Sequence, residues 1–170
     1  DHDVGAFFAD ALLNIRPWDQ WTKTGEPQPG TLEIVATLER VLALKPDHVF
    51  GLHLTIHALE ASPNPERALA AARRLDGLVP GAGHLLHMPA HIYVRLGHWW
   101  ASVQANQRAL AADRDYFRRA GPQGVYEFYK GHDHHFVVYS ALFLGNHDLA
   151  LGAARDFVSE CSPQAMAAMP

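Results

Sequence analysis

The same kinds of residue recur 34 positions apart along the middle of this chain. The pairs are Leu44 and Leu78, Pro46 and Pro80, His53 and His87, His57 and His91, and the turn residues Pro63 and Gly97. A fixed spacing of this length indicates stacked structural units, because one such unit cannot bury its apolar face alone. Gly145 follows Gly97 by 48 positions, which we interpret as the same unit with about 14 inserted residues.

Apolar residues recur at helical spacing over most of the chain. This pattern predicts helices over residues 4–15, 31–44, 49–61, 66–78, 84–96, 99–113, 136–144 and 148–158, with Thr31 as the N-cap of the second. No stretch shows the alternation typical of a β-strand. Residues 16–30 hold three prolines and two glycines and are predicted to form a loop. Residues 115–131 are predicted to be a loop or a small extra helix.

Two helices in each unit of 34 residues resemble the tetratricopeptide repeat. The best-matching unit carries five residues typical of that family, Ala90, Tyr93, Gly97, Ala109 and Leu110. It departs from the pattern at Pro89, Asn106 and Arg114, so the repeats are divergent. The strings RPWDQW, HALEASPNPERAL, GHLLHMPAHIYVRLG and GHDHHF are similar to bacterial members of this family.

This resemblance implies an all-α solenoid of about three to four helix hairpins, in which the first helix of each pair lines a concave groove. We expect a single domain over residues 1–170. A start at Asp1 rather than Met is consistent with a fragment of a longer repeat array or with a processed product.

Composition excludes several classes of function. A net charge of −4, with 14 Lys and Arg residues spread along the chain, provides no basic stripe for a nucleic acid or an anionic membrane. No apolar run approaches the length of a membrane span. The single Cys161 excludes a thiolate cluster and leaves histidine and carboxylate as metal ligands. We expect a soluble protein, cytoplasmic by default, and the oligomeric state stays open.

Seven histidines occupy equivalent positions in the first helices of successive units. Overlaying the units by their turn residues gives three phases: His53, His87 and His135; His84 and His132; His57 and His91. Tyr139 stands where the last unit would continue the third phase, and Glu60 lies one helical turn beyond His57. We therefore expect the seven imidazoles to line one groove. Helix axes about 8–10 Å apart would allow two helices to share an ion with bonds of about 2.0–2.1 Å.

This arrangement predicts seven metal ligands, His53, His57, His84, His87, His91, His132 and His135. Ligands that are nearly all imidazole favour copper or zinc, with iron also possible, and disfavour magnesium or calcium. Polar lining of a peptide-binding groove is the alternative explanation. Helix packing gives no reason to repeat an imidazole in equivalent phases of three helices, so we favour the metal.

The function predicted from these residues is that of a metal-dependent enzyme acting on a small molecule in the groove. Copper or iron would support oxidation of an organic substrate with O₂, and zinc would support hydrolysis as the second choice. Glu60 is predicted either as a general base or as a residue that orients His57. Tyr139 is predicted as a proton donor, a pocket wall or a packing residue. The alternatives are a non-catalytic tetratricopeptide scaffold that binds a peptide or partner protein, and a metal storage or sensing protein.

The sequence also predicts which of several other residues are buried or exposed. Trp18 and Trp21 are predicted either to anchor their loop to the core or to wall the groove. We expect solvent exposure at three histidines beside turns, His48, His98 and His147. We expect burial at four residues with core spacing, Met88, Trp99, Trp100 and Phe143. Cys161 is predicted to be inert.

Overall fold

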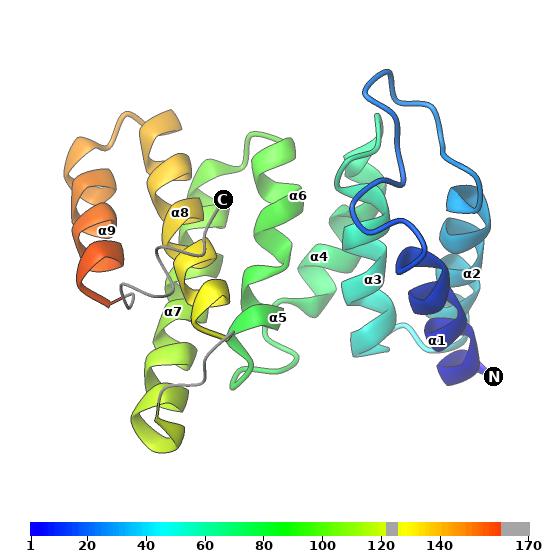
Figure 1. Ribbon diagram of the computed structural model, residues 1–170, viewed down its shortest axis with the longest axis horizontal. Coiled ribbons are helices and arrows are strands. Elements are labelled where there is room, and N and C mark those ends of the chain that lie inside the picture. Colours follow the sequence, from blue (N-terminus) through cyan, green and yellow to red (C-terminus); the bar gives the residue numbers. More distant parts are fainter. Residues whose placement is uncertain (122–125, 161–170) are drawn as a thin grey trace. The chain divides into compact units, whose positions relative to one another are not determined.

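The structure, a computed structural model, describes residues 1–121 and 126–160. Within these ranges every regular element is a helix, apart from one isolated β-bridge between Trp21 and Pro27 (Figure 1). The chain divides into two compact units, Asp1–Leu78 and Val79–Pro170. The all-α class predicted from the sequence is confirmed. Among the described residues, no helix combines the length and the apolar character that crossing a membrane requires.

The first unit contains α1 (His2–Leu13), α2 (Thr31–Leu44), α3 (Val49–Leu59), the 3-10 helix η1 (Pro65–Ala68) and α4 (Leu69–Leu75). Helix α3 is the centre of this unit, because α1, α2 and α4 all pack against it. The side chains of Leu38, Leu52 and Ile56 are fully buried between these helices. Gly5 lets α1 approach α2 closely, since a Cβ there would lie 2.8 Å from Cγ2 of Val41.

Hydrogen bonds hold the loop of residues 14–30 against the first unit. The indole Nε1 of Trp21 donates to the carbonyl of Ala58 in α3 at 2.7 Å. The Thr31 hydroxyl donates to the carbonyl of Gln20 at 2.7 Å. Trp21 therefore anchors the loop, which confirms one of the two predictions made for it. Trp18 behaves differently, because 83% of its surface is exposed and its backbone φ is +56°.

The second unit contains α5 (Gly83–His87), α6 (Pro89–Arg95), α7 (Trp99–Ala120), α8 (Glu127–Phe143) and α9 (His147–Glu160). Helix α7 packs against α5, α6 and α8, and α9 packs against α8. Part of the interior is apolar, with Val103, Leu110, Val137 and Ala153 forming one cluster. The rest is unusually polar, with these buried side chains: His87, Ser102, Asn106, Asp113, Asp133, His134 and Ser140.

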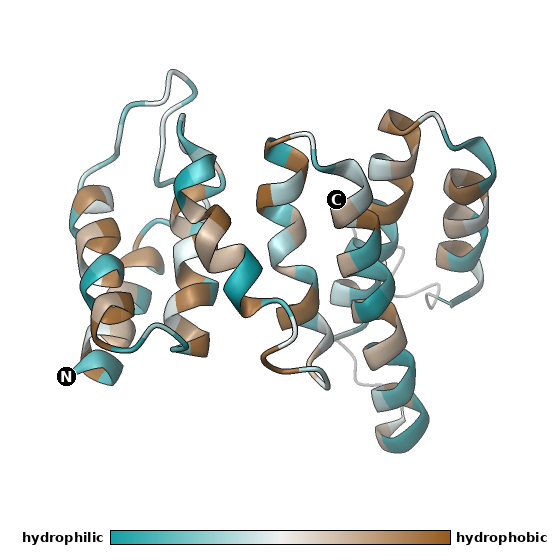
Figure 2. Ribbon diagram, turned by 180° about the vertical axis from the view of Figure 1, so that it is seen from behind, coloured by the Kyte–Doolittle hydropathy of each residue, from teal (hydrophilic) through white to brown (hydrophobic). Residues whose placement is uncertain are grey.

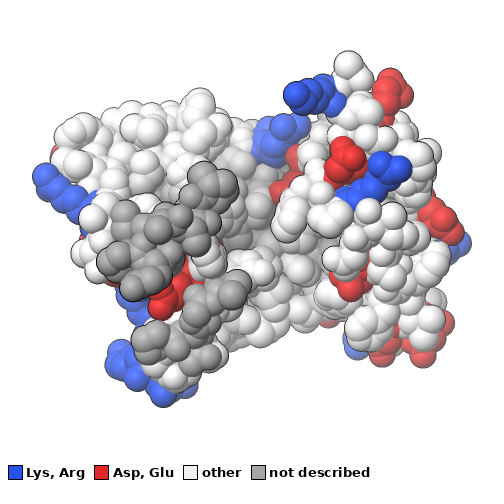
Figure 3. Space-filling model, viewed as in Figure 1, with Lys and Arg blue, Asp and Glu red and all other residues white. Residues whose placement is uncertain are grey.

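The surfaces of the helices follow the expected amphipathic pattern. Figure 2 shows that most helices carry both hydrophobic and hydrophilic residues, as helices do when one side is buried. On the face in Figure 3, positive and negative side chains are interspersed. Ion pairs in the described part of the chain include Arg67 with Glu39 at 2.7 Å and Arg74 with Asp47 at 2.5 Å.

Three predicted helical segments differ from the structure by more than a shift of one or two residues at an end. The helix expected over residues 84–96 is divided into α5 and α6 at Met88, because Pro89 has no N–H to donate to the helix, although Met88 keeps helical backbone angles. The helix expected over residues 66–78 begins as 3-10 turns and ends at Leu75. The insertion expected over residues 115–131 lengthens α7 to Ala120 and starts α8 at Glu127, while residues 122–125 lie outside the described ranges.

Several predictions about exposure were wrong. Trp100 and Phe143 are 53% and 56% exposed, although both have core spacing. Met88 is fully buried as predicted. Thr31 is the first residue of α2 rather than its N-cap, because Gly30 takes the cap position with φ +91°. Cys161, predicted to be inert, lies outside the described residues.

His48 was also predicted wrongly, since it is buried and caps α3. Its Nδ1 accepts a hydrogen bond from the backbone N–H of Gly51 at 3.0 Å. An accepting Nδ1 leaves the proton on Nε2, which donates to Asp3 Oδ1 at 2.8 Å. Both ring nitrogens are therefore used within the fold, although His2, Asp3 and His48 lie close enough together to resemble a metal site. His98 and His147 are exposed as predicted.

Replacing His48 by alanine is expected to lower the free energy of unfolding by about 1 kcal/mol, because side-chain N-caps contribute about 0.5–2 kcal/mol. His98→Ala is the matched control, since His98 stands at the N-cap of α7 without a side-chain cap bond. Its effect should be within about 0.5 kcal/mol. Urea denaturation measures both, and equal effects would contradict the capping role of His48.

Candidate metal centre

Three histidines of the second unit converge from separate helices. His87 ends α5, His91 lies in α6 and His132 lies in α8, and one ring nitrogen of each is within 4.8 Å of the others. The Nε2 atoms of His87 and His91 are 2.8 Å apart. Ligands in a tetrahedral site with bonds of about 2.0–2.1 Å are separated by about 3.3 Å. The Nε2 atoms of His87 and His91 are slightly closer than that, and the His132 nitrogen lies within 4.8 Å of both, so the three nitrogens are near enough to be considered as ligands of one ion.

The orientation of His87 is fixed by Asn106 of α7. Both side chains are fully buried, and His87 Nδ1 lies 2.6 Å from Asn106 Oδ1. The Asn106 amide nitrogen donates to the carbonyl of Ser102 at 2.8 Å, which identifies Oδ1 as the acceptor facing His87. His87 therefore carries its proton on Nδ1 and presents an unprotonated Nε2 toward His91. This is the tautomer that a metal-binding imidazole needs, held by the kind of outer hydrogen bond found in metal sites.

Asp133 places a buried carboxyl group next to His87. Its carboxylate is 1% exposed and its Oδ1 lies 3.0 Å from His87 Nδ1. Neither carboxylate oxygen has a hydrogen-bond partner among the described residues, because the Nδ1 proton is directed to Asn106. Burial raises the pKa of Asp133 well above its usual range, and the charge of His91 opposes this shift. The ionised form would be stabilised by additional positive charge nearby.

A second buried carboxyl, Asp113, lies in the same interior. It accepts a hydrogen bond from the Tyr126 hydroxyl at 2.9 Å. Burial raises the pKa of Asp113 to about 6, the Tyr126 hydrogen bond opposes the shift, and the charge of Asp133 adds to it. Gly83 lies directly against this carboxyl, since a Cβ on Gly83 would meet Asp113 Oδ1 at 1.9 Å.

The raised pKa of Asp113 predicts a pH dependence of stability. Between the ordinary pKa of 3.8 and about 6, the folded chain holds a proton that the unfolded chain has lost. Stability should therefore fall as pH rises through this window, by up to about 3 kcal/mol for a shift of this size. Asp113→Asn should flatten that slope. Urea denaturation from pH 4 to pH 7 measures it, and a slope that is unchanged in Asp113→Asn would contradict this assignment.

Phe136 of α8 packs against the three imidazoles. Its ring centroid lies 4.8 Å from those of His87 and His132 and 5.0 Å from that of His91. His87 is fully buried, whereas His91 and His132 keep contact with solvent, so the cluster is open on one side.

Two of the predicted ligands in this unit lie outside the cluster of three. His84 has its ring 6.3 Å from that of His87 and packs edge-on against Tyr129 at 4.6 Å. His135 is exposed on α8, one turn beyond His132. Tyr139, predicted as a catalytic residue, is 43% exposed and packs against Phe143 at 4.9 Å. The roles predicted for these residues stay predictions.

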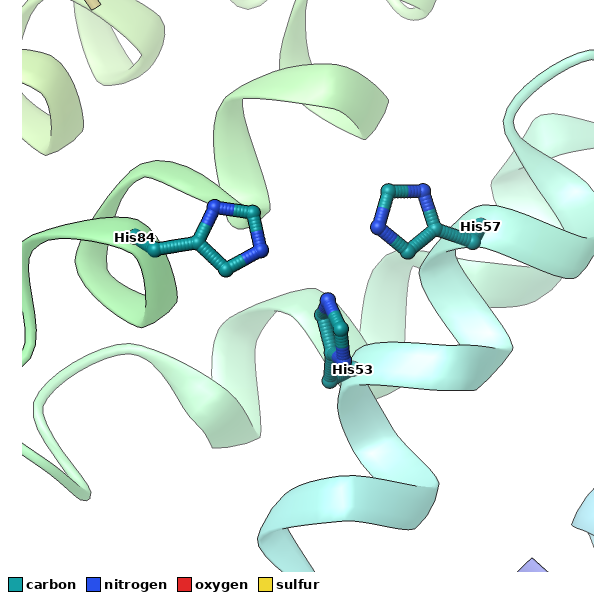
Figure 4. A group of neighbouring side chains, drawn as sticks. All are labelled: His53, His57 and His84. Atoms are coloured by element: carbon teal, nitrogen blue, oxygen red, sulfur yellow. The ribbon is translucent and has the colours of Figure 1, made fainter. Parts of the chain in front are cut away.

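His53 and His57 form a pair on α3 in the first unit. Both side chains project from the same side of the helix (Figure 4), with ring centroids 4.7 Å apart. His57 Nδ1 lies 2.9 Å from Glu60 Oε1. This contact fits the orienting role for Glu60, one of the two roles predicted for it. That these histidines share one groove with those of the second unit stays a prediction.

Sequence reasoning missed His134 and the residues that support His87. His134 is 1% exposed, and both of its ring nitrogens lack a hydrogen-bond partner in the described ranges. Its Nε2 is 3.6 Å from Glu160 Oε2, and burial lowers the pKa of the His134 imidazole. The string Asp133-His134-His135 offered a signal, but the repeat phases directed attention to His132 and His135.

Comparison with known proteins assigns the chain to no family. No family model matches it, and no curated protein is significantly similar to it. The histidine clusters and their surroundings are therefore the observations from which a function can be inferred.

Proposed function

We propose that the second unit binds one transition-metal ion through His87, His91 and His132, and that the protein is a metal-dependent enzyme. The main support is the buried imidazole of His87, which is held in place by Asn106. Its Nε2 lies only 2.8 Å from Nε2 of His91. Two imidazoles this close share a proton in the absence of a cation. A bound metal ion would take the place of that proton and would be held by the lone pairs of both nitrogens.

Copper and zinc are the favoured metals, and iron is the third choice, because all three ligands are imidazoles. Three protein ligands leave a position for a substrate or water, as in catalytic rather than structural sites. A bound copper or iron ion would supply electron transfer with O₂, whereas zinc would supply an activated water. Asp133 and Asn106 contact Nδ1 of His87, on the side of the ring away from Nε2, which supports an orienting role for both. A ligand set made only of imidazoles favours oxidation of a small organic substrate, with zinc-dependent hydrolysis as the second choice.

We further propose that the fold is a divergent tetratricopeptide-like solenoid. The residues that resemble the repeat support this, since Ala90, Ala109 and Leu110 are all buried. Gly97 and Gly145, which end the first helices of two hairpins, have similar φ values of +73° and +66°. A non-catalytic scaffold that binds a peptide in the groove is the alternative within this fold.

Elemental analysis of the full chain, purified without a histidine tag, tests the proposal. We expect about one copper, zinc or iron ion per chain, retained through gel filtration. For copper, the EPR spectrum should show nitrogen hyperfine structure, and visible and EPR spectra separate copper and iron from zinc. A chain that retains no metal after incubation with each ion would contradict the proposal and favour the peptide-binding scaffold.

A further inference from the structure

The first unit contains a pocket that is lined in part by the exposed Trp18. It has a volume of about 180 Å³, and its lining includes Leu13, Pro17, Trp18 and Leu54 as apolar walls. Polar groups are contributed by Asp10 of α1 and by His57 of α3. Sites for drug-sized ligands usually occupy about 300–1,000 Å³, so this pocket fits a smaller molecule.

Trp18 is held at the pocket in an unfavourable backbone conformation. A φ of +56° is rare for a residue with a large side chain, and such conformations persist only when the surroundings impose them. Two hydrogen bonds fix the loop around this residue. Gln20 Nε2 donates to the carbonyl of Arg16 at 2.5 Å and so spans Trp18, and Trp21 donates to the carbonyl of Ala58 in α3. The fold thus keeps an indole exposed beside a pocket rather than burying it, and ligand-binding sites are where such conformations concentrate.

The charges around the pocket favour a cation. None of the described residues that line it is a lysine or arginine, whereas Asp10 is acidic. Glu60 places a second carboxylate on His57, with Oε1 2.9 Å from Nδ1. The face of an indole attracts cations, and it is most effective for ammonium groups with apolar substituents, which hold water weakly. Apolar walls, an indole and nearby carboxylates together form the recognition elements for an alkylammonium group.

We propose that this pocket binds a small organic cation, of the alkylammonium class, between Trp18 and Asp10. The cation stacks on the indole face, its substituents contact Leu13 and Leu54, and the carboxylates neutralise its charge. Binding at this site does not require the metal centre of the second unit.

Choline and its neutral isostere 3,3-dimethylbutan-1-ol form a matched pair of probes, because they differ mainly in the charge of the central atom. The full chain is treated with EDTA, and ligand-observed NMR follows the methyl signals of each compound during titration. We expect saturable binding of choline and about tenfold weaker binding of the alcohol. Equal binding of the two compounds, or no saturable binding of choline, would overturn the proposal.

Two variants locate the site. Trp18→Ala should weaken choline binding at least about tenfold, whereas Trp100→Ala, which removes an exposed indole from the other unit, should leave it unchanged. Asp10→Asn keeps the size of the side chain and should weaken binding a few-fold. Circular dichroism verifies that each variant is folded. Undiminished binding by folded Trp18→Ala and Asp10→Asn would place choline elsewhere and overturn the assignment.

Discussion

Replacing Gly83 by alanine is expected to destabilise the chain by about 3 kcal/mol or more. A Cβ at this position would lie 1.9 Å from Oδ1 and 2.5 Å from Cγ of Asp113. Asp113 cannot rotate away at little cost, because it is buried and accepts the hydrogen bond from Tyr126. Overpacking of a well-packed interior typically costs about 1–3 kcal/mol, and the displaced carboxyl adds the cost of an unpaired buried polar group.

Gly81→Ala is the matched control for this substitution. A Cβ on Gly81 would meet no atom within 4 Å, and this glycine precedes the same helix. Its effect on the free energy of unfolding should lie within about 0.5 kcal/mol. Urea denaturation at pH 7 measures both variants. A Gly83→Ala chain as stable as Gly81→Ala would show that α5 does not approach Asp113 as closely as described.

Removing the imidazole of His87 is expected to weaken metal binding at least about 100-fold. Loss of a supporting residue alone typically costs about 10–100-fold in metal affinity, and His87→Gln removes a ligand itself. Asn106→Leu keeps the ligand but removes the acceptor that holds its proton on Nδ1. We therefore expect an intermediate loss of about 10–100-fold for Asn106→Leu.

Competition with a chromophoric chelator measures these affinities for zinc and copper. His147→Gln serves as the control, because the His147 side chain is 81% exposed on α9 and belongs to no histidine cluster in the described ranges. Its affinity should equal that of the unaltered chain. If His87→Gln and His147→Gln bind metal equally well, the ion is bound elsewhere and the proposed centre is wrong.

Much of the helical framework could be predicted from apolar spacing and from the turn residues. The same spacing correctly placed His87 and His91 on one side of successive helical turns, and the repeat phases added His132. Apolar spacing did not predict the break at Met88, which leaves His87 in α5 and His91 in α6. Pro89 was visible in the sequence as a departure from the repeat, but its effect depends on how α5 and α6 pack against α7.

The role of Asn106 also could not be predicted from the sequence. The sequence showed a polar residue at a repeat position that is normally apolar. The structure explains this asparagine, because its side-chain amide holds His87 in one tautomer. Burial of Asp113 and Asp133 could not be read from helical spacing, since carboxylates are rarely buried and only tertiary contacts decide their environment. His48 was misjudged for a related reason, because its cap bond to Gly51 and its contact with Asp3 exist only in the folded unit.

X-ray absorption spectroscopy of the full chain, loaded with one equivalent of zinc or copper, is the most direct test of metal binding by His87, His91 and His132. We predict three imidazole nitrogens at about 2.0–2.1 Å from the metal, with the multiple scattering typical of imidazole rings. His87→Gln should lose one of the three. A first shell dominated by water or carboxylate oxygen, or one that His87→Gln leaves unchanged, would contradict this prediction.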